Sequence, residues 1–333
     1  MTRIWTEGWE LKDTVGYITT SGSVSTSAKR SGSASFQLSG GTGILDSVAK
    51  SFTATSEIYL RYAFYVQSGL SPYNQVSWRK GTTVIGKVEY SSGYNVITAG
   101  ALSDTGIINI ILDTWYLLEV HIKIDNAAGV IEVKLDGNAD CDVSGDTQPG
   151  ADTTIDNILI QGGYYGRTTY LDDMAINDTA GGVDDGWCGD GKIIMLTPND
   201  DVTTELTQYP ALTDHHADVD DYPADGDTTY VEGSVVDEED KYELTASGLV
   251  AADVASINRV WCEARSKNTT ANPGEVALFI YSDATEGTGT DVVLGSSYTT
   301  KVMSQEFLQD PDGPAAWSVA ALDALQGGIR TRD

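Results

Sequence analysis

Cysteine is scarce in this 333-residue chain. Cys141, Cys188 and Cys262 are odd in number, lie far apart and show no paired spacing. Such a set builds neither a disulfide framework nor a zinc site, so the three thiols are predicted to be reduced and structural. Histidine is equally rare, and the chain has no nucleophile elbow, phosphate loop or dinucleotide fingerprint. Together these absences predict a protein without enzymatic activity.

Basic residues are scarce as well. The chain has 20 Lys and Arg against 49 Asp and Glu, a net charge of −29. This charge repels nucleic acid and anionic membranes, so neither is expected as a partner. No stretch reaches the roughly eighteen consecutive apolar residues that a membrane helix needs. The opening MTRIWTEGWELKD does not join a basic segment to an apolar one, so no signal peptide is expected.

The clearest pattern in the chain is a hairpin between Asp113 and Gly137. From Tyr116 to Asp125 apolar and polar residues alternate, which indicates a strand with one buried face. Residues 126–129 form a turn and lead into a second alternating run, Val130–Leu135. Two such runs joined by a short Gly-containing loop predict an antiparallel hairpin. Because one face of the hairpin is apolar, it needs a second sheet to pack against.

Short β-rich runs at fairly even spacing supply that sheet. Glu57–Val66 is dense in aromatic and β-branched residues, and Thr153–Gln161 and Thr169–Asn177 lie on either side of a turn rich in Gly and Tyr. Gly106–Leu112 and Lys192–Leu196 are also predicted to be strands. No convincing helix separates these runs, which favours an all-β sandwich.

The pattern breaks at residues 178–191, where Gly and Asp dominate. We therefore place a boundary there, with a first domain at residues 1–183 and a second domain at residues 184–333. The second domain is predicted to be a smaller β-sandwich with one short C-terminal helix. That helix is expected within Trp317–Gly328, with Ser318 as its N-cap.

Four polar residues alternate along the first hairpin strand, namely Glu119, His121, Lys123 and Asp125. Some sandwich glycosidases carry their catalytic residues in line on a strand. Retaining enzymes need two carboxyl groups about 5 Å apart, whereas positions two or four residues apart on one strand face are separated by roughly 7 or 13 Å. His121 and Lys123 also occupy places where those enzymes carry carboxylates. The series therefore predicts a solvated strand face without a catalytic residue.

An acidic segment, DYPADGDTTYVE at residues 221–232, resembles a twelve-residue calcium loop with Gly226 in the sharp-turn position. Pro223 stands where a third ligand belongs, and no helix flanks the segment. Calcium is thus the one cofactor for which the sequence offers candidate ligands, and these are Asp221, Asp225, Asp227 and Glu232. The alternative interpretation is an acidic turn that leads into a strand.

Two further groups were weighed as sites. His215 and His216 stand among acidic residues. Adjacent side chains on an extended chain point in opposite directions, so at most one can serve a given metal, and the pair is interpreted as a surface loop. Tyr164, Tyr165 and Tyr170 offer rings that either stack on a sugar or pack within the protein.

The opening WTEGWE, the strand EIYLRYAFYV, the hairpin and the strand YLDDMAIND resemble the concanavalin A-like, laminin-G-like jelly rolls over about Ile4–Asp178. Farther on, GWCGDGKIIMLTPNDD, DTTYV, DKYEL and the closing DPDGPAAWSVAALDALQGGIR resemble tailed-phage virion structural proteins. The resemblance implies a concanavalin A-like jelly-roll sandwich followed by a smaller β-sandwich domain. It also implies a non-enzymatic component on the capsid or the tail. The ligand motif of lectins and the catalytic pattern of glucanases have no match in this chain.

The resulting expectation is a structural component of a tailed-virus virion, namely an outward-facing capsid decoration or head-fibre protein. A tail-associated receptor-binding adhesin and a carbohydrate-active enzyme are the alternatives. Expected partners are the major capsid protein or tail proteins of the same virion, further copies of the chain in a homo-oligomer and, for an adhesin, a glycan of the host surface. The chain is expected to be made in the host cytoplasm and to reside in the virion.

Overall fold

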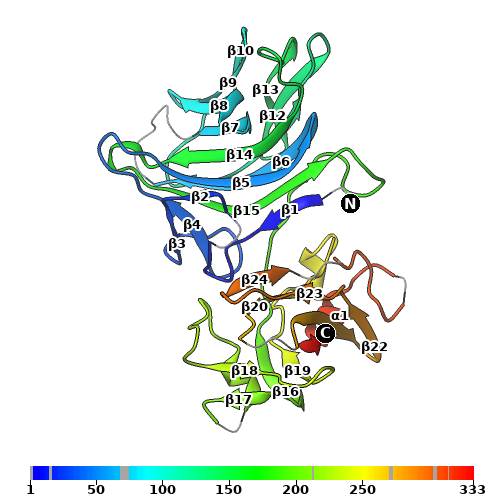
Figure 1. Ribbon diagram of the computed structural model, residues 1–333. Coiled ribbons are helices and arrows are strands. Elements are labelled where there is room, and N and C mark those ends of the chain that lie inside the picture. The colour runs from blue at the N-terminus through cyan, green and yellow to red at the C-terminus, as the bar shows by residue number, and fades with distance from the viewer. Residues whose placement is uncertain are drawn as a thin grey trace. The chain divides into compact units, whose positions relative to one another are not determined.

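Two compact units, Met1–Ile194 and Met195–Asp333, make up the chain in a computed structural model (Figure 1). The structure describes residues 3–14, 17–67, 75–211, 214–269, 273–302, 306–313 and 315–333. Antiparallel strands dominate both units, so the predicted all-β class is confirmed. No helix within the described ranges is long and apolar enough to cross a membrane.

The first unit contains two sheets. Sheet A has the spatial order β13 (Asn138–Gly145), β12 (Gly129–Leu135), β11 (Trp115–Lys123), β6 (Glu57–Val66), β15 (Thr169–Asp178), β4 (Ser35–Leu38) and β3 (Ser23–Ser25), and β1 (Arg3–Glu7) pairs with β15. Sheet B has the order β10 (Leu102–Thr105), β9 (Tyr94–Ala99), β8 (Thr83–Ser91), β7 (Gln75–Lys80), β14 (Ile155–Gly162), β5 (Asp46–Thr55) and β2 (Thr19–Thr20). A short 3₁₀ turn, η1 (Tyr164–Gly166), connects β14 to β15.

The predicted hairpin is β11–β12, which lies between β6 and the edge strand β13 of sheet A. The residues of β11 predicted to be apolar and inward-facing, from Tyr116 to Ile122, are buried, and β12 alternates strictly between buried and half-buried positions. Ile122 lies opposite Ile58 on β6 and Ile131 on β12, and none of the three side chains is exposed. One hydrophobic core joins these residues to the inner faces of both sheets, as sheet-on-sheet packing requires.

The second unit is built on one sheet, with the order β16 (Pro198–Thr204), β19 (Glu239–Leu244), β25 (Gln326–Arg332), β21 (Glu275–Ser282) and β22 (Thr285–Thr288), and β23 (Val292–Val293) pairs with β21. Two short ribbons accompany it, β17 (Thr207–Tyr209) with β18 (Tyr230–Glu232), and β20 (Glu263–Ser266) with β24 (Thr299–Val302). The helical elements are η2 (His215–Asp218), η3 (Ala251–Asp253) and α1 (Val319–Asp323).

The C-terminal helix is confirmed, together with its N-cap. The Ser318 hydroxyl accepts a hydrogen bond from the Ala321 N–H at 3.0 Å. The helix is shorter than predicted, because β25 begins at Gln326. Within β25, a Cβ at Gly328 would overlap the carbonyl of Asp240 and the ring of Phe279, so this glycine permits close strand packing rather than ending a helix.

Two predicted strands are wrong, and the compact units divide at another point than the predicted domains. The first unit extends to Ile194, whereas the sequence predicts a first domain that ends at residue 183. Lys192–Leu196 forms no strand, because it is the passage from one unit to the other. Gly106–Leu112 forms a loop, in which Ile108 N–H binds the Asp140 carboxylate at 2.9 Å instead of a neighbouring strand.

We expect Ile122→Ala to lower the free energy of unfolding by about 2–5 kcal/mol, because it leaves a cavity between Ile58 and Ile131. Denaturant unfolding followed by tryptophan fluorescence measures the loss. Lys123→Ala is the matched control, since it changes the adjacent half-buried position on the other face and should alter stability by only about 0.5 kcal/mol. Equal losses in the two variants would contradict the assignment of the core face.

Candidate functional site

The outer face of sheet A, which points away from the core, carries the polar series of the hairpin. Residues 184–194, here called the strap, run across this face after β15. The backbone N–H of Gly189 donates to Glu119 Oε1 at 2.7 Å, and Arg61 donates to the Gly189 carbonyl at 3.1 Å. Farther along, the Ile193 N–H donates to Asp173 at 2.8 Å. These contacts hold the strap on the sheet.

The predicted solvated face is therefore wrong for the middle of β11. Glu119 is 4% exposed and His121 is 8% exposed, although both alternate with core residues as an outward face should. Lys123, nearer the end of the strand, is half-buried. The signal that the sequence interpretation missed is the pair Trp187-Cys188 within the Gly- and Asp-rich segment, since two apolar side chains are unusual in a solvated linker.

His121 lies at the centre of a polar cluster that strand register assembles. Its Nδ1 is 2.7 Å from Glu132 Oε2 and its Nε2 is 2.8 Å from Glu57 Oε1. Directly opposite on β6, Tyr59 stacks on the imidazole with ring centroids 4.3 Å apart and planes inclined by 6°. Both carboxylates can accept from the ring only when both nitrogens carry protons. In that state His121 has no free lone pair and cannot act as a general base.

Trp187 of the strap covers the cluster. Its ring meets Tyr59 edge-on at 5.4 Å and His121 at 6.0 Å, and Lys134 Nζ lies 3.7 Å from the indole centroid. Burial, followed by the charges of Glu57 and Glu132, raises the pKa of Tyr59, so its hydroxyl stays protonated at neutral pH. The cluster thus has the residue types of an acid–base site, with both ring nitrogens of His121 engaged by carboxylates.

A second cluster of charges fixes the other end of the strap. A bulge in β15, where Asp173 has a φ of 50°, presents two adjacent carboxylates to the loop at residues 30–33. Asp172 accepts from the backbone N–H groups of Arg30, Ser31 and Asp173 at 2.7, 3.2 and 2.8 Å. The Arg30 guanidinium binds Asp173 at 2.8 Å and also binds Asp190 of the strap.

Burial governs the protonation of these carboxyl groups. Neither Asp172 nor Asp173 is exposed, and burial together with the Asp173 charge raises the pKa of Asp172 to about 7. Burial also raises the pKa of Glu10, whose Oε2 accepts from Ser33 N–H at 2.6 Å. Glu10 Oε1 has no hydrogen-bond partner in the part of the chain that the structure describes.

The candidate calcium ligands do not converge on one point. Asp225 accepts from the Thr229 N–H at 3.2 Å, and Asp221 accepts from the Thr229 hydroxyl at 3.3 Å. Asp227 instead forms an ion pair with Lys267 and accepts from the Tyr298 hydroxyl at 2.8 Å, while Glu232 lies exposed on β18. Among the described residues no group of three or more His, Cys, Asp or Glu side chains is placed to hold a metal ion. Calcium binding by this segment stays a prediction.

The two adjacent histidines serve different carboxylates. His215 Nδ1 is 2.7 Å from Asp240, and His216 Nδ1 is 3.1 Å from Asp201. Asp240 is fully buried and also accepts from the Glu205 and Leu206 N–H groups and from the Tyr242 hydroxyl. These bonds anchor η2 to the sheet, which gives both histidines a structural role.

The tyrosines weighed for sugar stacking are separated in the structure. The side chain of Tyr164 lies outside the described residues, Tyr165 is 59% exposed and Tyr170 is 4% exposed. Tyr170 faces Tyr65 on β6, and Tyr65 faces Trp115 on β11. The centroid distances from Tyr65 are 5.9 Å to Tyr170 and 5.5 Å to Trp115. Three aromatic rings therefore lie side by side on the outer face of sheet A, a grouping that sequence spacing does not show.

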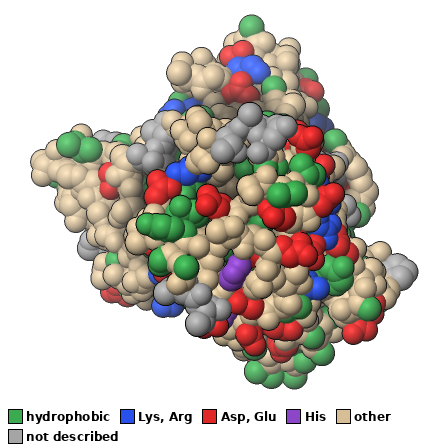
Figure 2. Space-filling model, turned by 60° about the horizontal axis from the view of Figure 1, so that its bottom comes forward, with side chains coloured by type: hydrophobic (Ala, Val, Ile, Leu, Met, Phe, Trp, Pro, Cys, Tyr) green, Lys and Arg blue, Asp and Glu red, His purple; other side chains and the backbone are tan. Residues whose placement is uncertain are grey.

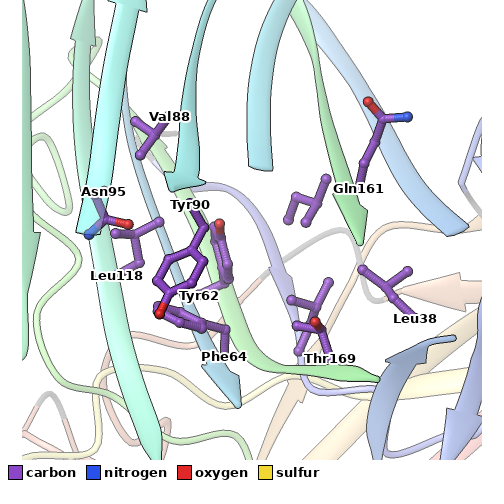
Figure 3. Close-up of a pocket in the computed structure, with 11 residues that line it drawn as sticks. Leu38, Tyr62, Phe64, Val88, Tyr90, Asn95, Leu118, Gln161 and Thr169 are labelled. Carbon is purple, nitrogen blue, oxygen red and sulfur yellow. The ribbon is translucent and has the colours of Figure 1, made fainter. Parts of the chain in front are cut away.

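A small cavity lies inside the sandwich rather than on this face. It measures about 20 Å³ and is lined by apolar side chains of both sheets with Asn95, Gln161 and Thr169 among them (Figure 3). Thr169 Oγ1 is buried and has no hydrogen-bond partner in the described ranges. This space suits about one water molecule and is too small for a substrate.

The comparisons with known proteins assign no chemistry to the site. No family model matches the chain, and no curated protein does. A fungal endo-β-1,4-glucuronan lyase from Trichoderma reesei is 15% identical, with 54% of this chain and 96% of that chain covered and a TM-score of 0.44. The cellulose-induced protein Cip1 is 16% identical, with 56% and 100% covered and a TM-score of 0.43.

A carbohydrate esterase from a Shiga toxin-encoding bacteriophage is 12% identical, with 48% of this chain and 88% of that chain covered and a TM-score of 0.37. Likenesses at this level carry no argument about activity. The chemistry of the outer face therefore follows from the contacts described above.

We expect stability to fall as pH rises from about 4 to about 7. In this interval the unfolded chain releases the protons of Asp172 and Glu10, whereas in the folded protein burial raises both pKa values, that of Asp172 to about 7, so these protons are released at higher pH. The folded state then binds more protons, and each such group lowers the free energy of unfolding by up to about 1.4 kcal/mol per pH unit. Denaturant unfolding at several pH values measures the slope.

Glu10→Gln is the matched variant for this slope. It keeps a side-chain carbonyl oxygen that can accept from Ser33 and removes one titrating group, so the pH dependence should become shallower. A wild-type stability that rises with pH across this interval would overturn the assignment.

Glu119→Ala tests the attachment of the strap. It leaves the Gly189 N–H without its acceptor, so we expect a loss of about 1–3 kcal/mol and faster amide hydrogen exchange at Gly189. Glu89→Ala on sheet B removes a carboxylate far from the strap and serves as the control. Unchanged exchange at Gly189 in Glu119→Ala would show that other contacts hold the strap.

Proposed function

We propose that the chain is a non-enzymatic structural component of a tailed-virus virion, an outward-facing capsid decoration or head-fibre protein. The absence of enzymatic activity is proposed because the polar side chains of β11 are occupied by contacts within the protein. Glu119 binds the backbone of the strap, and His121 is held between two carboxylates. These side chains thus take part in contacts that hold the fold together. The virion placement rests on the sequence resemblance.

The acidic surface supports an outward-facing position. On the face seen in Figure 2, Asp and Glu side chains outnumber Lys and Arg, with hydrophobic side chains scattered between them. A net charge of −29 keeps such a surface soluble and hinders contact with nucleic acid inside a capsid. In this proposal the partners are the major capsid protein or tail proteins and further copies of the chain, with contacts made by sheet faces and loops.

A tail-associated adhesin is the second candidate, and a different observation favours it. Tyr65, Trp115 and Tyr170 form an aromatic group on the outer face of a sheet, outside the sandwich core. Aromatic rings at a surface are the usual means of holding the apolar face of a ligand.

Electron microscopy of purified virus particles labelled with an antibody against this chain tests the placement. We expect label over the head, with many copies per particle. Label confined to the tail would replace the decoration role by the adhesin role. Particles without label would overturn the virion proposal.

An activity assay tests the non-enzymatic part separately. We expect the purified chain to leave neutral and uronic polysaccharides uncleaved, since His121 is bracketed by Glu57 and Glu132. Turnover that disappears in Glu119→Gln would contradict the proposal, because this change preserves an acceptor for Gly189 and removes only the acid.

A further inference from the structure

Strand register extends the aromatic group into a line across sheet A. Trp115 on β11 faces Tyr65 on β6, and Tyr65 faces Tyr170 on β15. Tyr170 in turn faces Gln37 on β4, and Gln37 faces Ser23 on β3. We call these five residues the aromatic row. Since neighbouring strands lie about 4.8 Å apart, the row runs about 19 Å across the sheet.

The rings of the row are not part of the sandwich core. The neighbouring residues Phe64 and Tyr116 point inward and belong to the core, whereas Tyr65 and Trp115 alternate with them and point outward. Both outward rings keep part of their surface exposed. Tyr170 is buried and meets Tyr65 edge-on, with planes inclined by 62°, so it supports the Tyr65 ring from one side.

The row carries no charged side chain. Two residues along the same strands, the next outward positions are Leu117, Ala63 and Asp172, and Glu119 and Arg61 lie two residues farther along β11 and β6. The Asp113 carboxylate touches the row, because it accepts from the Tyr65 hydroxyl at 3.0 Å. In a chain with a net charge of −29, a row without a basic side chain repels anionic ligands. An uncharged ligand with one apolar face suits it better.

We propose that the aromatic row binds neutral pyranose units of a polysaccharide. The rings of Trp115 and Tyr65 pack against the C–H face of a sugar, and the Gln37 amide and Ser23 hydroxyl exchange hydrogen bonds with sugar hydroxyls. Amide and hydroxyl groups both donate and accept, as sugar hydroxyls do. This inference rests on the adhesin candidate and does not depend on labelling of the capsid.

Affinity electrophoresis of the full chain tests the proposal. Native gels are cast with neutral β-glucan, mannan or dextran, or with anionic alginate. We expect at least one neutral polysaccharide to retard the wild-type chain and alginate to have no effect. Trp115→Ala and Tyr65→Ala should each weaken binding by about tenfold, the order expected for loss of one ring contact.

Two variants control for folding and position. Gln37→Ala removes a half-buried amide and its exposed hydrogen bond to Ser39, so it should weaken retardation while leaving the melting temperature nearly unchanged. Tyr209→Ala removes a tyrosine that is 51% exposed in the second unit and should bind like the wild type. Retardation that survives both Trp115→Ala and Gln37→Ala, retardation by alginate alone, or none by any neutral polysaccharide would overturn the proposal.

The polysaccharide-binding result and the antibody-labelling result can be distinguished from each other. Label on the particle with no polysaccharide retardation would remove this site and keep the structural role. Retardation that depends on Trp115, in a protein absent from particles, would keep the site and remove the placement.

Discussion

The backbone of Gly189 lies between two buried charged side chains, and the arrangement of sheet A around the strap depends on this contact. Glu119 and Arg61 face each other on neighbouring strands, and each is 4% exposed. A buried charge is strongly destabilising without hydrogen-bond partners. The Gly189 N–H binds the carboxylate and its carbonyl binds the guanidinium, so the backbone of one residue serves both. With the strap in place, the Trp187 ring packs against His121.

Other buried acidic side chains are also hydrogen-bonded to the backbone, and the excess of acidic over basic residues explains why. Because the chain has too few Lys and Arg to pair its carboxylates, backbone N–H groups take their place. Asp240 accepts from two such groups and Asp172 from three. Carboxylates bound in this manner hold loops and turns against a sheet. Asp172 and Asp240 therefore hold neighbouring backbone segments in place.

The outer face of sheet A thereby has two parts, one covered by the strap and one with partly exposed aromatic rings. Its polar part lies beneath the strap, where Glu119, His121 and Arg61 are occupied by protein contacts. Its uncharged part carries Trp115 and Tyr65 with their ring surfaces partly exposed. Glu119 and Arg61 are therefore enclosed, whereas Glu132 beside His121 and the two rings remain partly exposed. In the proposed role of a virion component, the row is a means of touching a cell surface.

Sequence alone determined the hairpin, its buried face and the N-cap at Ser318, because these depend on neighbours a few residues apart. Alternation decided which side of β11 faces the core, and the scarcity of basic residues decided the charge of the surface. Only the tertiary structure decided what covers the other side. Glu119 and Gly189 are 70 residues apart, and nothing local marks them as partners. The aromatic row likewise depends on the register of strands that are distant in the chain, and Asp227 meets Lys267 only after folding. Contacts between distant residues are set by strand order and packing, which periodicity does not encode.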